Sequence, residues 1–154
     1  MGETKVAAMS TDDLAYPVKD WADWQPGSTE NLKTALQALK DYETGNIEAC
    51  VHSFADSVHL SFDGFEGRFS KDSVKKMFTT DRQNIKAMQI MMDDYESVKS
   101  KDGKREYVSM WYTQKWQDQK GNWDSVFQMD DLRMINGKIA SIDEKSRHFP
   151  KKKM

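Results

Sequence analysis

The chain has 154 residues, a length that suits one domain built around one sizeable core. Charged residues make up 31% and hydrophobic residues 38%, and because the formal net charge is -2 we predict no nucleic-acid partner and no anionic membrane surface. The single cysteine, Cys50, excludes an internal disulfide and a cysteine-based zinc site, and no apolar run reaches the roughly 20 residues of a membrane span.

Residues 1–28 show no clear periodicity and are predicted to form an N-terminal arm that packs on the domain. Pro17 and Pro26-Gly27 break regular structure, whereas Trp21 and Trp24 are too apolar to remain in water. We therefore predict a structural strap rather than a ligand-stacking element. The first residues lack the apolar stretch of a signal peptide, which favours the cytoplasm; removal of a leader would make an extracytoplasmic location possible.

Two helices with a tight break between them are predicted next. Ser28 or Thr29 can cap the first helix. Its apolar residues recur at helical spacing, and they are Leu32, Ala35, Leu36, Leu39 and Tyr42. Gly45 can end this helix in a left-handed conformation, and Asn46 can cap the second helix at once. We expect the second helix to end at Ala55-Asp56.

A short strand and a third helix follow. Ser57–Phe62 alternates between apolar and polar residues, which is typical of a strand. Asp63–Gly67 contains two glycines and is predicted to be a turn. Ser70 then caps a short helix, and the predicted buried face of this helix consists of Val74, Met77 and Phe78.

The remaining sequence is predicted to be long strands joined by tight turns. The strands are Ile85–Ser100, Arg105–Gln117, Trp123–Ile135 and Lys138–Phe149. They carry large apolar side chains on both faces, whereas a sheet with one wet face would alternate more cleanly. Both faces are therefore predicted to be covered, one by the helices and the other by a second copy of the chain.

This order of elements resembles the SnoaL-like branch of the nuclear-transport-factor-2-like (NTF2-like) superfamily. The likeness rests on the helix break in Tyr42–Ala49, the strand entry in Phe54–Val58 and the hairpin in Ile135–Ile139. It covers residues 29–149 and leaves 150–154 as a basic tail. The resemblance implies an α+β fold, in which a cone-shaped, bent antiparallel sheet wraps around three N-terminal helices as a cystatin-like roll with an apolar pocket inside.

The same resemblance implies several functions. Members include ketosteroid isomerases, polyketide cyclases, epoxide hydrolases, dehydratases and many proteins with no known reaction. Homodimers formed through the outer sheet face are common among them, which agrees with the large apolar side chains on both faces of the predicted long strands. The fold alone does not determine which of these functions the chain has.

Asp130 is the leading catalytic candidate. Aligned on the last hairpin, it matches the position where ketosteroid isomerases place an oxyanion-stabilising aspartic acid. The face of the strand that carries Asp130 would point into the pocket, where burial would raise the pKa of Asp130. A neutral carboxyl could donate to a carbonyl, and an ionised one could take a proton. The alternative is an ordinary paired or half-exposed carboxylate.

The tyrosine and the base of the isomerases fall at Ala38 and near Ser61, which disfavours steroid isomerisation.

His59 is the second catalytic candidate, because on the family pattern its strand face looks into the cone and histidine can act as a base near neutral pH. A histidine that is merely hydrogen-bonded at a strand edge is the alternative. The predicted ligand-binding side chains are Tyr112, Gln114, Trp116, Gln128 and Glu144. For Tyr112 and Trp116, core or dimer contacts are an equally good interpretation. No histidine has metal-ligand spacing, so we predict no metal, and we predict no cofactor.

These observations favour a SnoaL-like protein of unassigned activity, with an enclosed pocket for a small, largely apolar ligand. The alternative is a lyase or isomerase, similar to a cyclase or dehydratase, in which Asp130 and His59 transfer a proton. A third hypothesis is a protein-interaction module that uses the sheet face.

Overall fold

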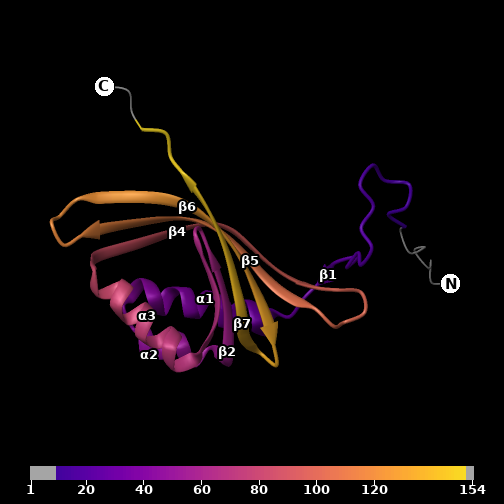
Figure 1. Cartoon of the computed structure of the whole chain (residues 1–154), viewed down its shortest axis with the longest axis horizontal. Helices are drawn as coiled ribbons and strands as arrows, with labels where there is room; N and C mark the ends of the chain where they lie inside the picture. The colour runs from indigo at the N-terminus through magenta and orange to yellow at the C-terminus, as the bar shows by residue number, and fades with distance from the viewer. Residues whose placement is uncertain (1–9, 152–154) are drawn as a thin grey trace.

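The protein was analysed as a computed structural model that describes residues 10–151. In chain order these residues form β1 (Gln25–Pro26), α1 (Thr29–Thr44), α2 (Ile47–His52), β2 (Phe54–Phe62), β3 (Phe65–Ser70), α3 (Lys71–Gln83), β4 (Ile85–Lys99), β5 (Glu106–Asp118), β6 (Trp123–Ile135) and β7 (Lys138–His148). Figure 1 shows the helices gathered at one end of a long curved sheet and the N-terminal arm at the other. The predicted α+β architecture is confirmed.

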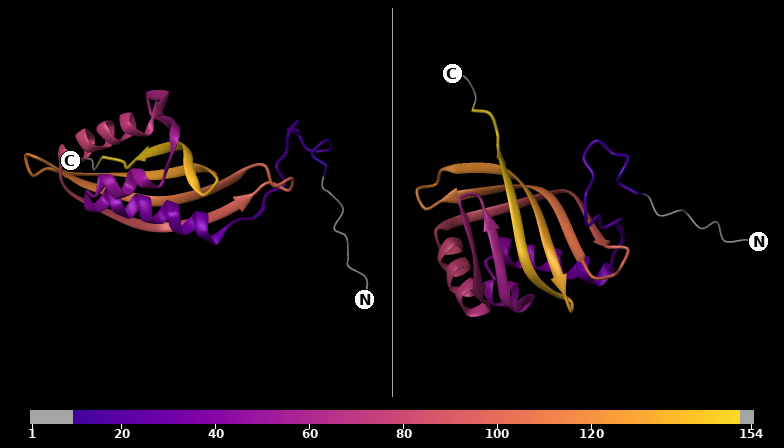
Figure 2. Two further views of the ribbon diagram at one scale, coloured as in Figure 1. Left: turned by 90° about the horizontal axis from the view of Figure 1, so that it is seen from below. Right: turned by 45° about the vertical axis from the view of Figure 1, so that its right-hand side comes forward.

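One seven-stranded open sheet, with the order β1-β4-β5-β6-β7-β2-β3, forms the body of the described residues. Its strands bend around the helices, as both views of Figure 2 show. Neighbouring strands are antiparallel except β2 and β7, which run parallel, so the expected antiparallel sheet is in fact mixed. The parallel pair is possible because β3, α3 and three long strands separate β2 from β7 in the chain and supply the crossover that parallel strands need.

Local capping explains the break between the first two helices. The Ser28 side chain accepts a hydrogen bond from the Asn31 amide at 3.1 Å and begins α1. Gly45 ends α1 with a φ of 85°, a left-handed conformation that glycine adopts without steric cost. The Asn46 side chain then accepts from the Ala49 amide at 3.2 Å and begins α2. The predicted helix break is confirmed.

The region after the second helix differs from the prediction. Strand β2 begins at Phe54 rather than Ser57. The predicted turn is confirmed at Asp63-Gly64 but is wrong at Gly67, which lies inside β3. Gly67 does not form a turn; instead, the Phe69 ring lies close to its backbone. A Cβ atom at this position would lie 2.8 Å from the Phe69 ring, so any residue other than glycine would force that ring or the backbone to shift.

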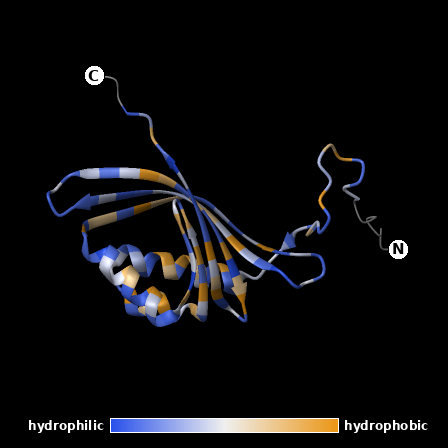
Figure 3. Cartoon of the chain, viewed as in Figure 1, coloured by the Kyte–Doolittle hydropathy of each residue, from blue (hydrophilic) through white to orange (hydrophobic). Residues whose placement is uncertain are grey.

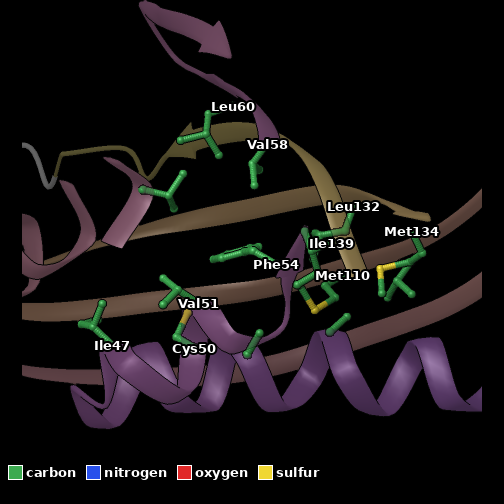
Figure 4. Close-up of a cluster of buried hydrophobic side chains, with 14 of the residues drawn as sticks. Ile47, Cys50, Val51, Phe54, Val58, Leu60, Met110, Leu132, Met134 and Ile139 are labelled. Carbon is green, nitrogen blue, oxygen red and sulfur yellow. The ribbon is translucent and has the colours of Figure 1, made fainter. Parts of the chain in front are cut away.

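The core lies between the helices and the inner face of the sheet. Figure 4 shows buried side chains from α2, β2 and the long strands above helix α1, among them Phe54, Met110 and Leu132. Hydrophilic and hydrophobic residues alternate along the long strands (Figure 3). The predicted inward face of α3 is confirmed, since Val74 is fully buried and Met77 and Phe78 pack against the core. None of the described helices is long and apolar enough to cross a membrane.

The described part of the N-terminal arm contacts the far end of the sheet. Strand β1 pairs with β4, and the Ala22 carbonyl accepts from the Lys101 amide at 2.9 Å. The Trp24 ring packs edge-on against Tyr107 with centroids 5.6 Å apart, and the Arg105 guanidinium lies 5.5 Å from the Trp24 ring. Residues 1–9 of the predicted arm, and residues 152–154 of the predicted basic tail at the other end of the chain, lie outside the described residues.

Arg82, near the end of α3, connects the helices to the start of β4. Its Nε donates to the Tyr42 carbonyl at 3.1 Å and its Nη2 donates to the Glu43 carbonyl at 2.9 Å. Its Nη1 donates to the Ile85 carbonyl at 2.9 Å. The last turn of a helix leaves carbonyls without intrahelical partners, so this one side chain satisfies the end of α1 and holds it beside α3.

Replacing Arg82 with Ala is therefore expected to lower the free energy of unfolding by about 2 kcal/mol, because three charge-assisted hydrogen bonds are lost. Arg82→Lys should not restore the loss, since a single ammonium group cannot reproduce the planar fork of donors. Urea denaturation measures both variants. Lys86→Ala, at an exposed position close by, is the control, and equal stability of Arg82→Ala and this control would contradict the prediction.

Candidate functional site

A cavity of about 220 Å³ lies between the inner face of the sheet and the helices. Most of its lining is apolar: Ala35, Ala38, Leu39, Cys50, Phe54, Phe62, Phe78, Met110, Leu132, Ile139 and Ile142. The polar lining residues are Tyr42, Asp81, Tyr112, Gln114, Gln128, Asp130 and Glu144. A mostly apolar hollow with a few convergent polar groups has the composition of a small-molecule site.

Asp130 lies at the centre of the polar lining. It is only 4% exposed, and it stands opposite Glu144 in the register of β6 and β7. The Tyr112 hydroxyl donates to Asp130 Oδ2 at 2.6 Å. The other oxygen, Oδ1, is buried and has no hydrogen-bond partner among the described residues. Buried polar atoms are nearly always paired, and this oxygen could be paired either by a proton held between the Asp130 and Glu144 carboxyls or by a donor on a bound molecule.

Burial controls the protonation of this carboxyl pair. Burial raises the pKa of Asp130 well above its usual value; repulsion from the Glu144 carboxyl and a hydrogen bond with it raise the pKa further, and the Tyr112 hydrogen bond opposes the shift. Burial also raises the pKa of Glu144, although hydrogen bonds with Asp130, Tyr112 and Gln128 oppose this shift. Because two like charges in an apolar space repel each other, the pair favours a state in which at least one carboxyl holds a proton.

The two phenols of the cavity are held neutral. Burial raises the pKa of Tyr42 to about 12, with smaller contributions from Asp81 and Glu144. Burial and the adjacent Asp130 carboxyl raise the pKa of Tyr112 well above its usual value. Both hydroxyls therefore remain hydrogen-bond donors at neutral pH.

The glutamine side chains form a separate polar group. Gln128 Nε2 donates to Gln114 Oε1 at 3.3 Å, and the Ser146 hydroxyl donates to Gln128 Oε1 at 2.5 Å. These contacts orient both amides along the cavity wall. In contrast to Asp130 Oδ1, the Gln128 carbonyl oxygen already has a partner in the protein.

Side-chain alternation along the long strands predicts one inner wall, and five of the predicted site residues lie together on it. Tyr112, Gln114, Gln128, Asp130 and Glu144 all line the cavity. Trp116 does not line it, although it shares a strand face with Tyr112 and Gln114. Trp116 is half-buried and stands opposite Met88 and Asp124, two residues further along β5 toward the next turn, which places it past the cavity.

The structure separates His59 from Asp130, and this corrects the expectation that both face one cavity. His59 lines a groove on the other face of the sheet, together with Trp24 and Trp111. Its Nε2 lies 2.9 Å from Glu66 Oε1 on the neighbouring strand. The physical reason is the alternation of β2: Val58 and Leu60 are buried against the helices, so His59 must point away.

Two cavity residues were not among the candidates from the sequence. Tyr42 lies one helical turn after Ala38 and on the same face of α1, so the four-residue spacing itself was a signal that a phenol could reach the pocket. Asp81 comes from α3, where it continues at helical spacing the predicted buried face of Val74, Met77 and Phe78, so the same kind of signal was present there. Within residues 10–151, no group of His, Cys, Asp and Glu is arranged to hold a metal ion.

The cavity adjoins a surface groove between α3 and the β2–β3 hairpin. Phe62, Phe78 and Asp81 line both spaces. On the groove side, the Phe65 ring stacks between Phe62 and Phe69, with centroid distances of 6.3 and 5.5 Å. The three shared residues place this aromatic groove directly beside the cavity.

The comparisons with known proteins identify the fold. No family model and no curated protein matches the sequence. An NTF2-like protein from Anabaena variabilis matches with a TM-score of 0.64 and 17% identity, over 81% of this chain and 96% of that one. An LEH-like epoxide hydrolase from M. tuberculosis matches with a TM-score of 0.63 and 11% identity, over 78% and 84% of the two chains.

A Catenulispora acidiphila protein with a ketosteroid isomerase-like fold, solved with trimethylamine, matches with a TM-score of 0.60 and 10% identity, over 73% of this chain and 84% of that one. The chain therefore has the NTF2-like fold, as predicted. Identities this low establish the fold alone.

The raised pKa values predict how stability depends on pH. Because the folded pair holds protons more tightly than the unfolded chain, its stabilising contribution is complete below about pH 4, near the unfolded pKa values, and is lost as pH rises through the folded values. Asp130→Asn removes one titrating group. Between pH 4 and pH 8, the free energy of unfolding of this variant should therefore fall less steeply than that of the wild type, and the two slopes should differ by up to about 1.4 kcal/mol per pH unit.

Urea denaturation across this pH range tests the expectation. The matched control is Asp131→Asn, because Asp131 is the next residue of β6 and lies on the opposite face of the sheet. Identical pH profiles for Asp130→Asn and the wild type would show that Asp130 has an ordinary pKa.

Proposed function

We propose that the cavity binds a small, largely apolar ligand that carries one hydrogen-bonding group directed at Asp130. The observation that carries this proposal is the buried and unpartnered Oδ1 of Asp130 in a cavity of about 220 Å³. A buried polar atom without a partner costs about 1–3 kcal/mol, and a ligand that reaches it would offset that cost.

The shape of the site supports an apolar ligand body. Aromatic and aliphatic side chains form most of the wall, and the polar atoms gather on β5, β6 and β7 at one side. Such a ligand would be oriented by its polar end, while apolar contact supplies most of the binding free energy. The adjoining groove at Phe62 and Phe78 supplies its entry route.

A second candidate function is proton transfer, as in a lyase or isomerase of the cyclase or dehydratase type. It is favoured by the Asp130 and Glu144 carboxyls, which face each other and share a tendency to hold a proton. A protonated carboxyl would donate to a substrate oxygen and an ionised one would accept a proton. His59 has no part in this proposal. Two structural neighbours carry the names of an epoxide hydrolase and an isomerase-like protein, which is compatible with chemistry in this fold.

Filling the cavity tests ligand binding. Ala38→Leu adds side-chain atoms to the wall, so it should remove any small molecule that co-purifies with the wild type and should weaken its rebinding at least tenfold. Native mass spectrometry before and after solvent extraction measures occupancy. Ala87→Leu, on β4 and outside the cavity lining, is the control. Equal occupancy in both variants would mean that the ligand binds elsewhere.

If a substrate is found, Asp130→Asn distinguishes the two candidates. Proton transfer requires the carboxyl, so turnover should be abolished while the amide keeps a similar shape. Unchanged turnover would remove Asp130 from the mechanism and leave the cavity as a binding site.

We also propose that the outer face of the sheet forms a homodimer. Trp111, Phe127 and Met129 place large side chains on this face, which the helices do not cover. Arg133 lies on the same face, and its Nε is buried and has no partner among residues 10–151. An acceptor from a second copy would satisfy it, as an isologous interface allows.

Light scattering after size exclusion is expected to report a dimer for the wild type. Trp111→Glu should shift the protein toward monomer, because a charge would be buried in the interface. Trp123→Glu, at an exposed position near the β5–β6 turn, should leave the dimer intact. A wild-type monomer would contradict the dimer and would favour a module that binds another protein through this face.

A further inference from the structure

The cavity holds acidic and phenolic groups without a countercharge. Its titratable lining side chains come from six elements: Tyr42 of α1, Cys50 of α2, Asp81 of α3, Tyr112 of β5, Asp130 of β6 and Glu144 of β7. No Lys, Arg or His of the described residues lines it. Within the same residues no ion pair joins Asp130 or Glu144 to a cation. A buried carboxyl without a cation has a raised pKa and holds a proton, as this pair does, and a cationic ligand would replace that proton as the countercharge.

We propose that the ligand is a protonated amine with an apolar body, and that its ammonium group lies between the Asp130 and Glu144 carboxyls. The inference rests on the proposed function, ligand binding in this cavity, and narrows the class of ligand. An anionic ligand would enter a space that contains three carboxyls and no cation, so fatty acids and phosphates are disfavoured.

The unpartnered Asp130 Oδ1 points to the same chemistry independently. This oxygen is buried in the wall of the cavity, whereas Oδ2 already accepts from Tyr112. An ammonium group supplies several N–H donors, and a hydrogen bond from a charged donor to a carboxylate is roughly twice as strong as a neutral one. A metal ion would be the other candidate cation, but the described residues offer no ligand cluster for one.

The aromatic lining suits a cation with an apolar body. Tyr42, Phe54 and Phe78 present rings to the cavity, and ring faces attract cations within about 6 Å of their centroids. Asp81 stands where the cavity adjoins the surface groove. Lys76 also lines the groove, so the entrance carries both charges, and the attraction for an ammonium ion comes from the two carboxyls inside the cavity.

Binding of an amine would be linked to proton release. In the free protein, burial raises the pKa values of both carboxyls and repulsion from Glu144 raises that of Asp130 further, so the pair holds at least one proton. A cation between them favours the ionised forms and displaces that proton. Affinity for the amine should therefore increase with pH, as long as the amine itself stays protonated, and should weaken as pH falls.

Three probes of similar shape and different charge test the inference: benzylammonium, benzyl alcohol and benzoate. Isothermal titration calorimetry of the full chain should give at least about tenfold tighter binding for benzylammonium than for benzyl alcohol, with benzoate weakest. Titration in two buffers with different ionisation enthalpies should reveal proton release for benzylammonium alone.

Two variants locate the effect. Asp130→Asn and Glu144→Gln should each reduce the preference for benzylammonium over benzyl alcohol by about tenfold or more, and should reduce the proton release. The matched controls are Asp131→Asn, next to Asp130 on β6, and Asp143→Asn, next to Glu144 on β7. Both control residues line the groove on the opposite face of the sheet. The controls should keep the wild-type preference.

Each outcome decides a different point. If benzyl alcohol or benzoate binds the wild type as tightly as benzylammonium, the amine inference is wrong, while the proposed ligand site stands. If none of the three probes binds, both proposals are overturned. The wild-type comparison needs no variant, so a variant that fails to fold, as judged by circular dichroism, does not affect this test.

Discussion

The packing of α1, α2 and α3 against the inner face of a curved sheet determines both the core and the site. The bend brings the inner face of β5, β6 and β7 around the helices, and apolar side chains fill most of the space between them. Small residues on α1, Ala35 and Ala38, leave the space next to the strands unfilled. The cavity is therefore a consequence of the same packing that stabilises the fold.

Placing Asp130 and Glu144 on this packed face carries a cost in stability. Apart from Gln128, the inner face of β6 otherwise buries Val126, Leu132 and Met134, so an aliphatic residue would fit most of the pattern better than a carboxyl. Proteins retain groups that break a local rule mainly where they serve function. The unpaired oxygen of Asp130, the missing countercharge and the adjoining groove are the features that such a function would use.

Part of the site could be predicted from strand periodicity alone. The two-residue repeat along β5, β6 and β7 correctly placed Tyr112, Asp130 and Glu144 on one wall. Periodicity failed for Trp116, because it does not say where along a strand the cavity ends. For His59 periodicity was right and the family resemblance was wrong, because the alternation of β2 turns Val58 and Leu60 toward the core and therefore His59 away from it.

The sequence by itself determined the helices, the long strands and the face of each, because capping, turn chemistry and side-chain alternation act over a few neighbouring residues. It did not determine β1 and β3, two short strands that contain a proline or a glycine. Only the tertiary structure decided which elements meet. Tyr42 and Asp81 reach the cavity through helix placement, and β2 lies beside β7 although more than 70 residues separate them. The electrostatics of the carboxyl pair depends on that assembly, because burial and the distance between β6 and β7 side chains exist only in the folded chain.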